Sequence, residues 1–69
     1  MLTIEQVQEL IKMNGKCKVK VTRDGITSIG NRVTKDPDRN LWVECRSSEG
    51  KLLKVIPRVQ LHELFPVEE

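Results

Sequence analysis

Alternating lysines mark the stretch of this chain in which residue type and spacing point most directly to chemistry. Residues 16–22 place Lys16, Lys18 and Lys20 at every second position, with cysteine or valine between them. Because successive side chains of a strand point to opposite faces of a sheet, the three ammonium groups would project from one side. Such a row could neutralise the phosphates of a nucleic acid backbone. The stretch is therefore a candidate anion-binding surface.

Positive charge is concentrated in the same part of the chain. Residues 16–39 hold seven lysines and arginines against three aspartates, a local charge of +4, whereas the whole chain carries +2. The candidate nucleic-acid-binding residues are Lys16, Lys18, Lys20, Arg32, Lys35, Arg39 and Trp42. The alternative is that the lysines only keep the wet face of a sheet soluble and protect its edges. Their spacing does not choose between the two interpretations.

Trp42 is the one tryptophan of the chain. By strand alternation its ring lies opposite Leu41 and Val43, on the face of Glu44 and Arg46. An exposed indole could stack on a base or anchor a protein partner. The alternative is a ring that is covered by the N-terminal helix or by a neighbouring subunit.

Sequence signatures of catalysis or metal binding are not found. Cys17, Cys45 and His62 lack the close pairing of a structural zinc site, and Asp36 and Asp38 flank a proline in a turn pattern. The sequence contains no glycine-rich phosphate loop and no signature of an activated serine or cysteine. We therefore predict no catalytic residue, no metal and no cofactor. A pore formed by several subunits could still create a site that one chain does not show.

The elements that would position these residues begin with a helix over about residues 3–14. Thr3 and Gln6 form a capping box, and Leu2 and Val7 form the hydrophobic staple around it. The apolar stripe of the helix comprises Ile4, Val7, Leu10 and Ile11. Asn14-Gly15 supplies a left-handed stop. A helix this short is marginal alone in water, so it must pack on a sheet.

Strands make up the rest of the chain. Asp24-Gly25 predicts a tight hairpin between the lysine strand and a return strand from Ile26 to about Thr34. Gly30 interrupts the alternation of the return strand, which indicates a bulge or a sharp bend. Three further strands are expected at residues 41–46, 51–56 and about 61–65; Pro57 ends the fourth strand, and residues 57–60 form a short helical turn.

This order of elements resembles the SH3-like and Sm-like small barrels. Residues 19–33 look like the first Sm motif, with Gly25 and Gly30 bracketing the bent strand, and the preceding helix resembles that of the bacterial Hfq-type Sm-like proteins. The stretch from Leu41 to Leu53 also resembles the Rho-inhibiting Sm-like proteins. We expect a mainly β fold: an N-terminal α-helix followed by a five-stranded, strongly bent antiparallel SH3-like or Sm-like barrel. The single domain 1–69 would consist of the helix, a barrel over about residues 16–65 and a frayed acidic tail at 66–69.

The chain departs from these families at their functional motifs. The Tyr-Lys-His triplet of the Hfq-type proteins would fall near residues 55–58, which read Val-Ile-Pro-Arg, and His62 comes too late. Val55-Ile56-Pro57 followed by Leu61 resembles the end of SH3-like barrels such as the plasmid-borne dihydrofolate reductases, but their catalytic glutamine and tyrosine are absent. The resemblance therefore covers the architecture, and the Hfq-type nucleotide site does not carry over.

Size and composition set the expected partners. A chain of 69 residues with one phenylalanine, one tryptophan and no tyrosine has a small core, which favours a homo-oligomer. Without a targeting pattern or a long apolar run, we expect a cytoplasmic location and reduced cysteines packed as small hydrophobes. We predict a non-enzymatic nucleic-acid-binding module that takes RNA in preference to DNA. The alternative is a protein-interaction or regulatory module whose partner docks on an open strand edge or around Trp42.

Overall fold

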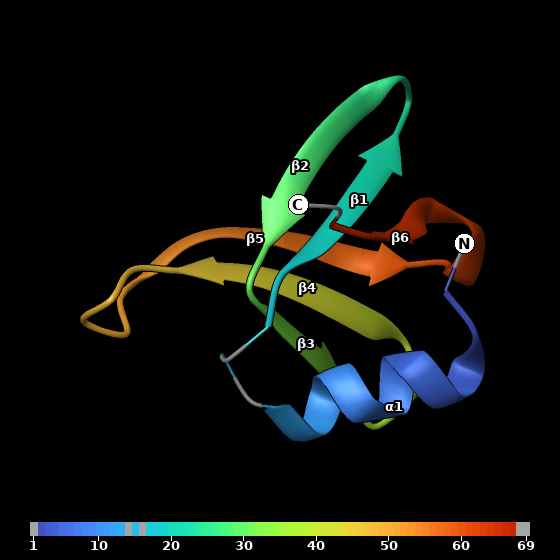
Figure 1. The fold of residues 1–69 in the computed structure, drawn as a ribbon, viewed down its shortest axis with the longest axis horizontal. Helices are drawn as coiled ribbons and strands as arrows, with labels where there is room; N and C mark the ends of the chain where they lie inside the picture. Colours follow the sequence, from blue (N-terminus) through green and yellow to red (C-terminus); the bar gives the residue numbers. More distant parts are fainter. Residues whose placement is uncertain (1, 14, 16, 68–69) are drawn as a thin grey trace.

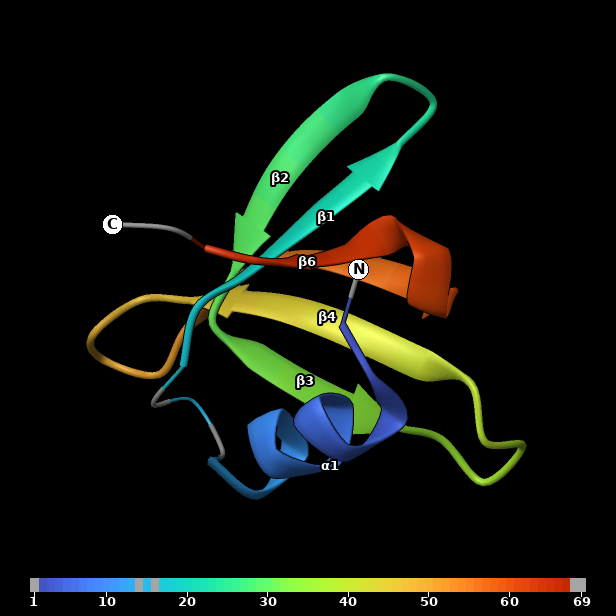
Figure 2. The same ribbon diagram turned by 45° about the vertical axis from the view of Figure 1, so that its right-hand side comes forward.

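The computed structural model describes residues 2–13, 15 and 17–67, and within them one α-helix precedes six strands (Figure 1). The elements are α1 (Ile4–Met13), β1 (Val19–Arg23), β2 (Ile26–Gly30), β3 (Arg32–Lys35), β4 (Leu41–Arg46), β5 (Leu52–Val59), the 3₁₀ helix η1 (Leu61–Glu63) and β6 (Leu64–Pro66). The strands form two antiparallel three-stranded sheets with the orders β2-β1-β6 and β3-β4-β5. In Figures 1 and 2 the β1–β2 hairpin rises away from the second sheet, and α1 lies beside β3. The predicted mainly β fold with an N-terminal helix is confirmed.

The start of α1 follows its sequence signals. The backbone N–H of Thr3 donates to Gln6 Oε1 at 2.9 Å, and the N–H of Gln6 donates to Thr3 Oγ1 at 3.1 Å, so the predicted capping box is confirmed. Leu2 and Val7, the predicted staple, are both buried in the core cluster. Gly15 has a φ of +92°, as a left-handed stop requires, and Asn14 lies outside the described residues.

The Asp24-Gly25 hairpin joins β1 to β2. Both residues have positive φ, 53° and 77°, and Arg23 pairs with Ile26 across them, which is the geometry of the predicted tight turn. The return strand then divides at Asn31: β2 belongs to the first sheet and β3 to the second. The Asn31 side chain holds this corner, since its Nδ2 donates to the Arg46 carbonyl at 2.7 Å and its Oδ1 accepts from the Arg46 N–H at 2.9 Å. The irregularity predicted at Gly30 is therefore the point where the chain changes sheets.

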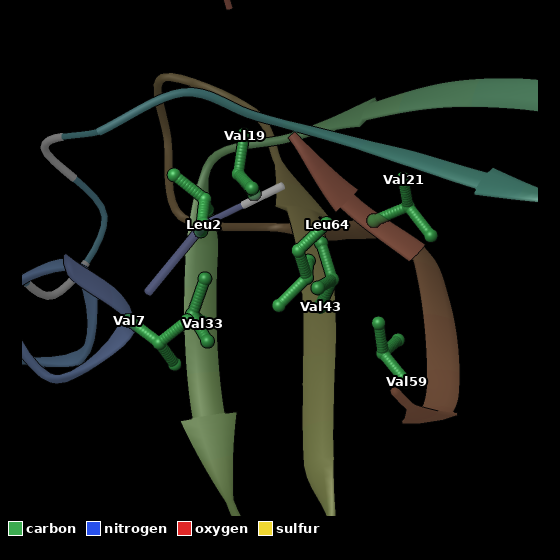
Figure 3. Packing of buried hydrophobic residues seen from close by; sticks show 8 residues of the cluster. All are labelled: Leu2, Val7, Val19, Val21, Val33, Val43, Val59 and Leu64. Atoms are coloured by element: carbon green, nitrogen blue, oxygen red, sulfur yellow. The ribbon is translucent and has the colours of Figure 1, made fainter. Parts of the chain in front are cut away.

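The core lies between the two sheets and the inner side of α1 (Figure 3). It consists of Leu2, Val7, Val19, Val21, Val33, Val43, Val59 and Leu64. Most members are valines on strands, where a β-branched side chain packs well. Val19 and Val21 are buried while Lys20, between them, faces away, so the predicted alternation of this strand is confirmed.

The prediction that Pro57 ends the fourth strand is wrong. β5 continues through Pro57 to Val59, and the helical turn lies at Leu61–Glu63 instead of residues 57–60. The proline is tolerated because β5 is the last strand in its sheet order and because the register with β4 is irregular between the pairs Val43↔Ile56 and Leu41↔Val59. Arg58, with a φ of 49°, lies in the same irregular segment. The last strand begins later than predicted, at Leu64.

A closed five-stranded barrel is not found. Within the described part of the chain the strand pairing gives two three-stranded sheets, and β2 and β5 each end the order of their sheet. Six strands replace the predicted five because the bend at Gly30 divides the long return strand. No helix in the described residues has both the length and the apolar character needed to cross a bilayer.

Candidate functional site

The structure separates the candidate nucleic-acid-binding residues into three groups. In the first group, Lys20 belongs to the face of the β2-β1-β6 sheet that points away from the core, and Lys18 precedes β1. Arg32 and Trp42 belong to the outer face of the β3-β4-β5 sheet, and Lys35 and Arg39 to a groove beside α1. Lys16 lies outside the described residues. The separation arises because the chain changes sheets after Gly30. The cations of residues 17–39 therefore do not share one continuous surface.

The first group combines an ammonium group with a ring. Lys20 pairs with Phe65 on one side and Ile29 on the other, so the three side chains share a face. The Lys20 Nζ lies 5.8 Å from the centroid of the Phe65 ring, within the range of a cation–π contact. Lys18, which precedes β1, is exposed and lines a hollow together with residues of α1. Phe65 has no sequence motif of its own, and only the β1–β6 register reveals its place beside the lysines.

The second group is held by internal partners. Arg32 Nη1 and Arg46 Nε both lie close to Glu44 Oε1, at 2.7 Å and 2.9 Å. The hydrogen bond from Arg46, together with the one from Arg32, lowers the pKa of the Glu44 carboxyl. A carboxylate between two guanidinium groups reduces the positive charge that Arg32 can offer to a phosphate.

Trp42 is half-buried, and its indole N–H is hydrogen-bonded within the chain. The indole Nε1–H donates to Asp36 Oδ2 at 3.0 Å. This bond, together with bonds from Asn40, lowers the pKa of the Asp36 carboxyl. The ring is thus anchored in one orientation beside the 36–40 loop, a more restricted position than the freely exposed ring that alternation alone suggests.

The third group lines an open groove of about 610 Å³. One wall is the side of α1 that carries Ile4, and the others are the start of β4 and the segment from the end of β5 to η1. The apolar lining consists of Ile4, Val7, Ile11, Leu41, Val59 and Leu61. Lys35, Arg39 and His62 add the basic side chains. Sequence reasoning missed this groove because its walls come from segments far apart in the chain.

The edge of β5 exposes a run of apolar side chains. Leu52, Leu53 and Val55 are exposed, with Leu53 at 61%. On the facing edge strand β2, Ile26 is 66% exposed. A hollow of about 200 Å³ lies between the two strands, and the long side chain of Lys54 reaches across it to donate from Nζ to Ser28 Oγ at 3.0 Å. The pattern of the sequence predicted both strands, but not which strand edges would be the open ones.

The thiol of Cys17 lies in an environment that disfavours its reactive form. Cys17 Sγ lies 3.4 Å from the Asn31 carbonyl oxygen, and burial raises the pKa of this thiol, which disfavours the nucleophilic thiolate. Both Cys17 and Cys45 are free thiols. Among the residues that the structure describes, no three histidine, cysteine or acidic side chains gather in a way that could hold a metal ion.

The described surface thus offers three candidate sites for a partner: the lysine face around Lys20, the groove beside α1, and the apolar edge of β5. A comparison of the chain with protein families, with curated proteins and with solved structures finds no match.

Proposed function

We propose that this chain is a non-enzymatic interaction module that docks a protein strand along the open edge of β5. The observation that carries the proposal is the exposure of Leu52, Leu53 and Val55 on a strand that ends its sheet. The outer edge of a terminal strand presents a row of backbone donors and acceptors that a further strand can satisfy. Exposed leucines beside that edge would add side-chain contacts to the new ladder.

A second copy of the chain is the partner that we propose first. The core of the described residues holds eight buried apolar side chains and no aromatic ring, so burial of the exposed leucines would add substantially to its stability. Pro57 lacks an N–H, which confines regular pairing to residues 52–56. In this proposal the two sheets are the halves of an open SH3-like or Sm-like barrel, and the partner strand extends one of them.

Introduction of a charge within the apolar run tests the proposal. We expect size exclusion coupled to light scattering to give a molar mass above the 7.9 kDa of the monomer. Leu53→Asp should weaken this self-association by about tenfold or more, as at an interface hot spot. Met13→Asp, which places the same charge on an exposed apolar residue of α1, is the matched control and should keep the wild-type mass. A monomeric wild-type chain, or equal effects of the two variants, would contradict self-assembly through β5.

RNA binding is a second candidate function, because Lys20 lies over a half-buried Phe65 ring on one sheet face and the exposed Lys18 precedes it by two residues. A phosphate could contact the ammonium groups while a neighbouring base stacks on the ring. DNA is a weaker alternative on the same face.

Reversal of both lysine charges tests the RNA candidate. If two phosphates are neutralised, Lys18→Glu with Lys20→Glu should reduce the slope of log affinity against log salt by about 1.4 for a single-stranded RNA. Fluorescence anisotropy of a labelled oligouridine measures the slope. Lys51→Glu changes an exposed lysine outside this face and should leave the slope closer to that of the wild type. The same slope in the double variant and the wild type would refute the candidate.

A further inference from the structure

The groove beside α1 exists because the β4–β5 ladder is irregular at its floor. Leu41 pairs with Val59, but the register shifts before the next pair, Val43 with Ile56, and Arg58 between them has a positive φ. This irregularity and the turn into η1 leave space that no side chain of α1 fills. Val7 and Val59, which belong to the core, line this space, whereas Ile4 is 59% exposed.

Basic side chains occupy the end of the groove nearest β3 and the following loop. Lys35 ends β3, and two backbone hydrogen bonds order the loop that carries Arg39: the Arg39 N–H donates to the Asp36 carbonyl, and the Asp36 N–H donates to the Asn40 carbonyl, both at 3.0 Å. The Asp36 carboxylate is hydrogen-bonded to the Trp42 indole and is not among the groove residues. No acidic side chain belongs to the described lining, so the groove combines an apolar floor with basic side chains at one end.

We infer that this groove binds a small amphiphilic carboxylate, a site beyond the β5 interface proposed above. The apolar body of the ligand lies against Val7, Leu41 and Leu61. Its carboxylate is held at Lys35 and Arg39, and Arg39 can donate two parallel hydrogen bonds to it. His62, in η1, supplies a further polar contact at the rim.

Size and shape favour a small molecule over a strand or a nucleic acid. A volume of about 610 Å³ lies within the range of roughly 300–1,000 Å³ that is typical of small-ligand sites. A strand requires an open ladder edge, and the groove is instead bounded by helical side chains and by the already paired Leu41 and Val59. Apolar lining with a few basic groups at one end matches a ligand that has a single anionic head.

Decanoate is the probe, and decanol and decylammonium are its matched controls, because the three share an apolar body and differ in the charge of the head. Each is titrated, below its micelle concentration, into the ¹⁵N-labelled full chain while backbone amide shifts are recorded. We expect saturable shifts confined to residues 4–11, 35–41 and 59–62. Decanoate should bind about tenfold more tightly than decanol, because a charged hydrogen-bonded head adds more than a neutral one. Decylammonium should bind most weakly.

A double variant tests the role of the basic residues. Lys35→Gln removes one charge and Arg39→Asn removes the other. Asparagine is chosen at position 39 because it tolerates the backbone φ of 67° found there. The double variant should bind decanoate and decanol equally, whereas Lys18→Gln, a lysine outside the groove, should keep the preference. The inference is overturned if wild-type decanoate and decanol affinities are equal, if the double variant keeps the preference, or if the shifts spread over residues 52–56 of β5 and over β1. The titration tests the groove even if the chain does not self-associate through β5, because the exposed leucines of the β5 edge do not line the groove.

Discussion

We expect Gly30→Ala to lower the free energy of unfolding by about 3 kcal/mol, at the upper end of the usual cost of overpacking a core. A Cβ atom at this position would overlap Cγ1 of Val43 and would lie 3.1 Å from the Glu44 carbonyl oxygen. Val43 is 1% exposed and packed among other core side chains, so its methyl group has little space into which to move. Urea unfolding followed by Trp42 fluorescence measures the change.

A double-mutant cycle separates this overlap from a general intolerance of side chains at the bend. Val43→Ala alone should cost about 2 kcal/mol because it leaves a cavity in the core. When the two substitutions are combined, the new Cβ of residue 30 occupies part of that cavity. The double variant should therefore be more stable than the sum of the single effects predicts, by about 1 kcal/mol or more. Additive effects would show that the cost arises in the backbone and not in contact with Val43.

The elements that could be predicted from the sequence depend on short-range interactions. The capping box of Thr3 and Gln6 and the Asp24-Gly25 turn each involve neighbours within three residues, and both form as predicted. Val19 and Val21 are buried because strand alternation is also a local property. Gly30 belongs to this class only in part: the sequence indicated an irregularity, but not that it divides one strand between two sheets.

Pro57 shows why strand ends could not be predicted. A proline is excluded from a central ladder but is tolerated in an edge strand or a bulge, and whether a strand lies at an edge is a property of the whole sheet. β5 is an edge strand with an irregular register, so it continues to Val59. The same long-range property leaves Leu53 and Val55 exposed.

The spatial arrangement of the candidate site residues could be predicted least from the sequence, because charges were counted along the chain and not across the sheet. Arg32 lies directly opposite Glu44 in the β3–β4 register, and this pairing turns a candidate phosphate ligand into a member of an ion pair. Trp42 similarly meets Asp36 across a loop. Cross-strand partners depend on register, which a single sequence specifies weakly when the connecting loop is long and polar.

Acid stability should depend strongly on Glu63, whose carboxylate is among the most buried charges in the described chain. Arg23 Nε and Nη2 donate to its two oxygens at 2.8 Å and 3.1 Å, and the Gln60 N–H donates to Oε1 at 2.8 Å. The hydrogen bonds from Arg23, and next the one from Gln60, lower the pKa of Glu63 to about 2. Arg23 Nη2 also donates to the Arg58 carbonyl at 3.0 Å, so this pair ties β1 to η1 and to the irregular end of β5.

We therefore expect Glu63→Gln to lower the free energy of unfolding at neutral pH by about 2 kcal/mol, the contribution of charged hydrogen bonds. Because the folded-state pKa of Glu63 is depressed, its stabilisation is complete above the ordinary carboxyl pKa and is lost as pH falls from about 5 towards about 2. The wild-type chain should lose stability steeply over this window, and the variant much less. Urea unfolding at a series of pH values measures both slopes, and Glu49→Gln, at an exposed position, should retain the wild-type slope. An equally steep slope in Glu63→Gln would place the acid-sensitive group elsewhere, with Glu44 between Arg32 and Arg46 as the next carboxylate to substitute.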